Sequence, residues 1–164
     1  MTLRELPGEV SARPLLPACE AVLERLDMQL ASEEGTRGTL LVIGLLRRDD
    51  GWPLSERTRS VVTTLLARSL RGEDWFGSSG GAEFAVLASA PPVAAVSMAE
   101  RLVAGIAGLG VAGLCGAAAL VPLAGDADAA ELLRRATVSL ATARRTGPGT
   151  VLHYREPAVA RFSW

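Results

Sequence analysis

Two adjacent glycines, Gly80 and Gly81, lie between two short apolar runs that are typical of β-strands, Trp75–Gly77 and Phe84–Ala88. A glycine pair at such a turn can adopt the positive φ angles that tight hairpins favour. It also leaves backbone N–H groups uncovered by side chains, so that they can face an anion. The pair therefore predicts a hairpin whose tip is able to approach a negatively charged group.

Charged residues precede this hairpin. Arg71 and Asp74 form an R-x-x-D element, and residues 75–79 separate it from the glycine pair. The element and the turn together resemble the GGDEF family of diguanylate cyclases. The family signature corresponds here to a degenerate sequence, whose third position is acidic in the family and alanine in this chain: Gly80, Gly81, Ala82, Glu83 and Phe84.

The resemblance extends over most of the chain. Hydrophobic periodicity and turn residues predict, in order, a helix at 15–30, a strand at 40–46, a helix at 55–70, the hairpin, a helix at 92–107, a strand at 111–121, a helix from 126 or 128 to 146, and a strand at 150–154. This order predicts an α/β (α+β) fold in which helices cover a mixed central sheet. The resemblance implies the palm-like fold of GGDEF domains and nucleotide cyclases, with a ferredoxin-like core. We expect a lead segment at 1–14, one domain at 15–154 and a tail at 155–164.

The resemblance also indicates which chemistry is missing. Cyclases of this family use two divalent metal ions, and such hard cations need carboxylate oxygens. The family's acidic positions correspond here to Gly44, Leu46 and Ala82, so that only Glu83 remains. One carboxylate cannot hold a metal pair. We therefore expect no diguanylate cyclase activity, no catalytic residue, no metal site and no cofactor. A phosphate-contacting lysine of the family corresponds to Arg144.

The R-x-x-D element implies a different role, because family members that carry it often bind cyclic di-GMP there. The resemblance gives the binding residues as Arg71, Asp74 and Arg101. An arginine can donate two hydrogen bonds to guanine O6 and N7, and the aspartate can accept from the guanine N–H groups. A structural interpretation stays open: Arg71 ends a helix, Asp74 closes the turn that follows, and Arg101 is a solvated helix residue.

Composition excludes other partners. The formal net charge is −1, and all 17 basic residues are arginine, so we expect no nucleic-acid binding. Residues 102–125 carry no charge, but their glycines, alanines and Pro122 favour a helix end, a turn and a buried strand over a membrane span. We interpret Cys19 and Cys115 as buried thiols in a reducing compartment, and therefore expect a cytoplasmic protein.

Three functions follow as hypotheses. The first is a cyclic di-GMP receptor without catalysis. The second is a ligand-free scaffold that binds a protein partner or forms a homodimer. The third is an enzyme with a rebuilt site for another nucleotide, and it is disfavoured because few carboxylates are available near Gly44 and Ala82.

Overall fold

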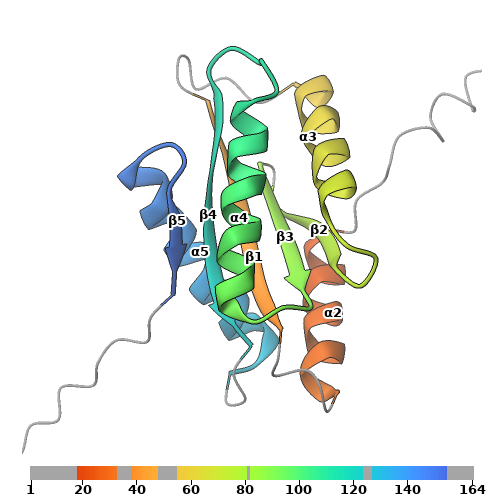
Figure 1. Ribbon diagram of the computed structural model, residues 1–164. Helices are drawn as coiled ribbons and strands as arrows, with labels where there is room; N and C mark the ends of the chain where they lie inside the picture. Colours follow the sequence, from red (N-terminus) through yellow and green to blue (C-terminus); the bar gives the residue numbers. More distant parts are fainter. Residues whose placement is uncertain (1–17, 33–37, 48–54, 81, 124–126, 155–164) are drawn as a thin grey trace, which may run out of the picture.

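The computed structural model describes residues 18–32, 38–47, 55–80, 82–123 and 127–154. These residues form one five-stranded sheet with helices on both faces (Figure 1). The elements are, in chain order, α2 (Cys19–Ala31), β1 (Thr39–Arg47), α3 (Glu56–Ser69), β2 (Trp75–Gly80), β3 (Glu83–Ala88), α4 (Pro92–Ala107), β4 (Leu114–Pro122), α5 (Ala129–Thr146) and β5 (Val151–His153).

The sheet has the strand order β2-β3-β1-β4-β5, with β1 at its centre. The pairs β1–β3, β1–β4 and β2–β3 are antiparallel, whereas β4 and β5 are parallel. The parallel pair is joined through α5, as parallel neighbours require a crossover connection. The mixed sheet covered by helices, which the sequence predicts, is confirmed.

The helices form two layers, and β1 has a buried face toward each. α3 and α4 cover one face of the sheet, and α2 and α5 cover the other (Figure 1). Leu41 and Ile43 of β1 belong to the core under α3 and α4, while Leu40 and Val42 belong to the core under α2 and α5. A strand that is buried on both faces has to be apolar at every position, which explains the continuous apolar run of β1.

Helix ends follow the expected capping residues. Ser55 is the N-cap of α3, and its hydroxyl accepts a hydrogen bond from the backbone N–H of Thr58 at 3.1 Å. Pro92 begins α4, where a missing N–H has no cost. Asp128, one of two predicted starts, caps α5. Gly147 ends that helix with a φ of 138°, which favours glycine.

The apolar spacing of residues 55–70 predicts an inward stripe of Val61, Val62, Leu65, Leu66 and Leu70, and Cys19 is predicted to be buried; the predictions for Val61 and Cys19 are wrong. Val61 is 38% exposed, because the buried side of α3 consists of Val62, Thr63 and Leu66. Thr63 is able to face inward since its hydroxyl donates to the carbonyl of Arg59 at 2.8 Å. Val62 and Leu66 are buried as the spacing predicts, and Leu65 and Leu70 pack against the same core. Cys19, expected to be a buried thiol, is exposed at the start of α2.

The described part of the uncharged stretch, residues 102–123, divides as the sequence predicts into the end of α4, a turn and β4. Gly110 and Gly113 of the turn have positive φ angles of 76° and 74°, respectively. None of the helices in the described ranges is sufficiently long and apolar to cross a membrane.

A partly exposed charge cluster lies on the first turns of α5. Glu131 accepts hydrogen bonds from Arg134 at 2.7 and 2.8 Å and from Arg135 at 3.1 Å. Arg135 also lies over the ring of Tyr154, 5.2 Å from its centroid. The hydrogen bonds from Arg134, and then those from Arg135, lower the pKa of Glu131 from 4.5 to about 2.

This lowered pKa predicts a pH dependence of stability. The stabilising effect of Glu131 is complete above pH 4.5, and it is lost as the pH falls from 4.5 toward about 2. We expect Glu131→Gln to lower the urea midpoint at neutral pH, and the difference from the wild type to shrink in acid. Thr137→Ala, on the exposed side of the same helix, is the non-titrating control. A difference for Glu131→Gln that is the same at every pH would contradict the prediction.

Candidate functional site

The β2–β3 hairpin places the two predicted groups at opposite ends of the sheet. Its register runs from Trp75 opposite Leu87 to Gly80 opposite Glu83. The R-x-x-D element directly precedes Trp75 and therefore lies at the open end of the hairpin. The signature residues lie at the closed end. The two candidate sites are therefore separate, and each has its own set of neighbours.

At the closed end, the structure describes every signature residue except Gly81. Gly80 does not adopt the expected positive φ: within the described ranges, such angles occur at Gly110, Gly113, Gly147 and Gly149. The reason is a register shift in β2 between Ser78 and Gly80, which keeps Gly80 within the strand pairing. A side chain on Gly80 would instead lie 3.2 Å from the carboxylate of Glu83. The glycine leaves room for that carboxylate.

The carboxylate of Glu83 is bound by an arginine from the far end of the chain. Arg144, in the last turn of α5, donates from Nη1 to Glu83 Oε1 at 3.0 Å and from Nη2 to the carbonyl of Ala82 at 3.4 Å. The side chains are 27% and 20% exposed, respectively. Arg144 Nε is buried and has no hydrogen-bond partner. The signature carboxylate is therefore already paired with a cation.

Gly44 of β1 completes this cluster. It is the register partner of Glu83 across the β1–β3 pair. A Cβ built on Gly44 would lie 2.6 Å from Nε and Nη2 of Arg144 and 2.7 Å from its Cζ. The guanidinium thus occupies the place of a side chain at position 44. In the described part of the chain, no three His, Cys, Asp or Glu residues gather in a way that could hold a metal ion.

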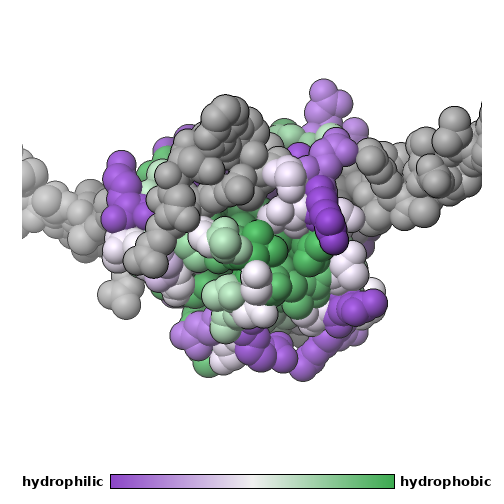
Figure 2. Space-filling view, turned by 90° about the horizontal axis from the view of Figure 1, so that it is seen from above, coloured by the Kyte–Doolittle hydropathy of each residue, from purple (hydrophilic) through white to green (hydrophobic). Residues whose placement is uncertain are grey.

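The surface around this end is largely apolar. Figure 2 views the molecule from the side where β1 ends and β4 begins, and hydrophobic residues form the centre of the coloured surface, with hydrophilic residues at its margin. Partly buried hydrophobic residues lie at this end. Leu46 is near the end of β1, and Leu109 and Val111 lie between α4 and β4.

At the open end, Asp74 organises the turn. Its Oδ2 accepts from the backbone N–H of Arg71 at 3.0 Å, and its Oδ1 accepts from the backbone N–H of Ser89 at 3.0 Å. The N–H of Asp74 donates to the carbonyl of Arg71 at 3.0 Å. The aspartate therefore joins the end of β3 to the turn before β2, as the structural interpretation of this residue requires.

The two arginines of the predicted ligand site are placed differently. The side chain of Arg71 is exposed beside Asp74, and that of Arg101 is exposed on α4. Among the described residues, Arg101 has no hydrogen bond or ion pair with Arg71 or Asp74. The turn thus brings together the two residues of the R-x-x-D element, whereas Arg101 belongs to a helix of the α3–α4 layer.

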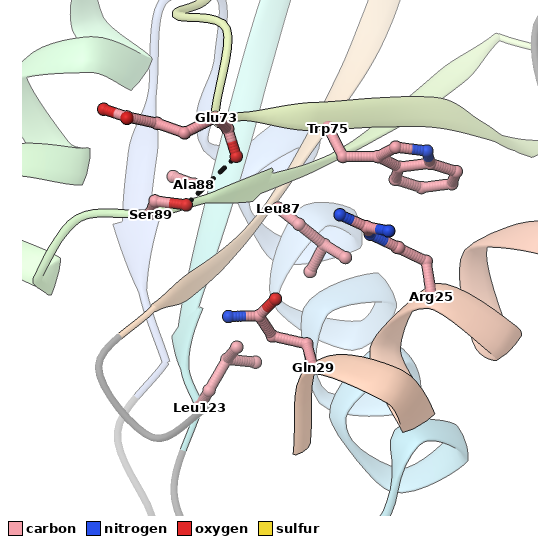
Figure 3. A pocket seen from close by; sticks show the side chains of 8 residues that line it. All are labelled: Arg25, Gln29, Glu73, Trp75, Leu87, Ala88, Ser89 and Leu123. Carbon is pink, nitrogen blue, oxygen red and sulfur yellow. Dashed lines mark hydrogen bonds between the residues drawn. The ribbon is translucent and has the colours of Figure 1, made fainter. Parts of the chain in front are cut away.

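A small groove lies beside the open end, on the side of α2. In Figure 3 the side chains of Arg25 and Trp75 lie next to each other, and the carboxylate of Glu73 points away from them. The floor is formed by hydrophobic residues, Leu87, Ala88 and Leu123. Arg25 could not be predicted as a groove residue, because a single arginine on an amphipathic helix carries no sequence signal of its own.

Solved structures with a similar fold are found. The coiled coil and GGDEF domain of DgcB from Caulobacter crescentus, in complex with c-di-GMP, matches with a TM-score of 0.74 and 17% identity, over 84% of this chain and 81% of that chain. This chain has the GGDEF-domain fold. The fold matches are low in sequence identity, which is why they establish the architecture and not the activity.

Two further GGDEF-fold structures show the same likeness. The active GGEEF domain of a diguanylate cyclase from Vibrio cholerae has a TM-score of 0.71 and 19% identity, over 86% of this chain and 99% of that chain. The diguanylate cyclase SiaD in complex with its activator SiaC, from Pseudomonas aeruginosa, has a TM-score of 0.73 and 18% identity, over 92% of this chain and 65% of that chain. No protein-family model matches the sequence, and no curated protein matches it either.

Proposed function

We propose that this chain is a catalytically inactive GGDEF-fold domain that binds cyclic di-GMP through Arg71, Asp74 and Arg101. The single observation that supports inactivity is the position of Arg144. Its guanidinium lies against Gly44, where a side chain would otherwise be, and pairs with Glu83 at 3.0 Å. The one signature carboxylate is therefore engaged by an internal cation, and the domain takes no metal pair for GTP cyclisation.

The ligand site is supported by the geometry of the R-x-x-D turn. Asp74 is held in a fixed orientation by two backbone N–H groups. Each carboxylate oxygen has two lone pairs, so that Asp74 keeps capacity to accept from a guanine. Arg71 is exposed next to it and presents a planar donor of the kind that recognises a guanine edge in two hydrogen bonds. The DgcB domain to which this fold is similar was solved with c-di-GMP.

Titration calorimetry with cyclic di-GMP tests this proposal. We expect the wild type to bind, and Arg71→Ala to weaken binding by roughly tenfold to a hundredfold, since a bidentate contact to guanine is worth about 1–3 kcal/mol. Arg68→Ala is the matched control, because Arg68 is an exposed arginine in the last turn of the preceding helix. It should leave the affinity unchanged.

GTP supplies the second arm of the experiment. The pure protein, incubated with GTP and magnesium, is expected to form no cyclic di-GMP. Turnover that depends on magnesium would overturn the inactive assignment and support an enzyme. Absence of cyclic di-GMP binding in the wild type would overturn the receptor assignment.

A ligand-free scaffold is the alternative, and one observation favours it. The signature end presents a hydrophobic centre (Figure 2), as expected of a surface that contacts a protein partner or a second copy. SiaD, of the same fold, was solved with an activator protein. Wild-type protein that binds neither nucleotide but forms a dimer in light scattering would support this alternative.

A further inference from the structure

Three features meet at the closed end of the hairpin: a position without a side chain, a guanidinium and a carboxylate. Gly44 and Glu83 are register partners in neighbouring strands. Side chains at such paired positions lie next to each other on one face of the sheet. Arg144 reaches this face from α5, which packs on it. Its guanidinium would be 2.6 Å from a Cβ at position 44, so a side chain at 44 would force the guanidinium to move out of this place.

The oxygen atoms of the cluster already have their positive partner. Glu83 Oε1 and the carbonyl oxygen of Ala82 both accept from the guanidinium of Arg144. Carboxylate and carbonyl oxygens are also the ligands that hard divalent cations take. A second cation beside the guanidinium would meet like charge at short range, where repulsion is strong in a half-buried site.

We propose that Arg144 is a built-in cation at this end of the hairpin, and that position 44 is glycine because Arg144 occupies its side-chain space. The inference deepens the proposed function and rests on it for the statement that no divalent cation binds here. It adds that the effects of Gly44 in β1 and of Arg144 in the last turn of α5 on stability depend on each other. The coupled pair fixes the signature strand to α5 without an added ion.

A thermodynamic cycle of unfolding temperatures tests the coupling. Gly44→Ala in the wild-type background should lower the Tm by roughly 2–4 °C, because the new methyl group displaces the guanidinium from Glu83. The same change in an Arg144→Ser background should leave the Tm unchanged or raise it. The guanidinium is then absent, and alanine is better than glycine in the interior of a strand.

The outcomes separate cleanly. If Gly44→Ala fails to fold alone but folds together with Arg144→Ser, the coupling is also supported. An equal loss in both backgrounds, or failure to fold in both, would overturn it. Arg145→Ser is the matched control, since Arg145 is the next residue, is exposed and hydrogen-bonds only to Thr142 in the described structure. In the Arg145→Ser background, Gly44→Ala should lower the Tm as much as it does in the wild type.

The cation part has its own measurement. Adding about 5 mM MnCl₂ should leave the Tm of the wild type unchanged, since a ligand stabilises only the state that binds it. A rise in Tm that disappears in Glu83→Gln would show a divalent ion at this cluster and overturn the inference. Neither measurement involves a nucleotide, so that a failed cyclic di-GMP titration leaves both results intact, and the reverse also holds.

Discussion

Replacing Phe84 by alanine is expected to lower the free energy of unfolding by about 3–5 kcal/mol, the largest effect of any single change considered for this chain. Phe84 has no exposed surface and is the largest fully buried side chain in the described part of the chain. It lies opposite Ile43 in the β1–β3 pair and belongs to the core under α3 and α4. Its removal leaves a cavity that the strands on either side cannot close. Chemical denaturation at neutral pH measures the loss.

Two controls make this prediction specific. Phe84→Leu keeps most of the apolar volume and should cost clearly less than the alanine change. Val93→Ala, at a position that is 84% exposed, should stay within about 0.5 kcal/mol of the wild type. A cost for Phe84→Ala below about 1 kcal/mol would mean that the hairpin is not anchored in the core as the structure has it.

The residues of the signature have structural contacts in this hairpin. Phe84 packs in the core, Glu83 pairs with Arg144, and the carbonyl of Ala82 accepts from the N–H of Leu45 at 2.9 Å. Gly80 leaves room for the carboxylate of Glu83. Phe84 and Glu83 therefore have structural roles for their side chains, and Ala82 takes part through its backbone. A signature sequence in this chain indicates the hairpin more directly than it indicates catalysis.

The fold was predictable because its signals are local. The apolar run of β1, the N-cap at Ser55 and the proline at the start of α4 each specify an element within a few residues of sequence. The order of elements then determines a mixed sheet, since crossovers and hairpins set strand directions. The error at Val61 arose because polarity alone does not show that a threonine can be buried: the hydroxyl of Thr63 is satisfied by the carbonyl of Arg59 within α3.

The candidate site was predictable only in part, because some of its contacts join residues that are distant in the chain. The sequence places Arg71 and Asp74 in one turn, since a short spacing keeps them close. It does not show that α5 brings Arg144 onto Gly44 and Glu83, because these residues come from three elements that are distant in the chain. The absence of a carboxylate at position 44 is visible in the sequence. What takes its place depends on the packing of α5 against the sheet.

Asp74→Ala is expected to cost about 1–2 kcal/mol of stability, whereas Arg71→Ala should stay within about 0.5 kcal/mol of the wild type. The carboxylate of Asp74 accepts from the backbone N–H groups of Arg71 and Ser89, both at 3.0 Å, and alanine leaves these donors to water. The side chain of Arg71 is exposed, and only its backbone takes part in these bonds. Urea denaturation of both variants measures the difference.

Asp74→Asn separates the two roles of this residue. It keeps one acceptor oxygen, so it should recover part of the stability that alanine loses. A guanine bound by Asp74 needs the carboxylate, because N1–H and the exocyclic amine each require an acceptor. Affinity for cyclic di-GMP should therefore fall as strongly in Asp74→Asn as in Asp74→Ala, while stability does not. If affinity instead follows stability through the three proteins, Asp74 serves the turn alone, and recognition of the ligand rests on Arg71.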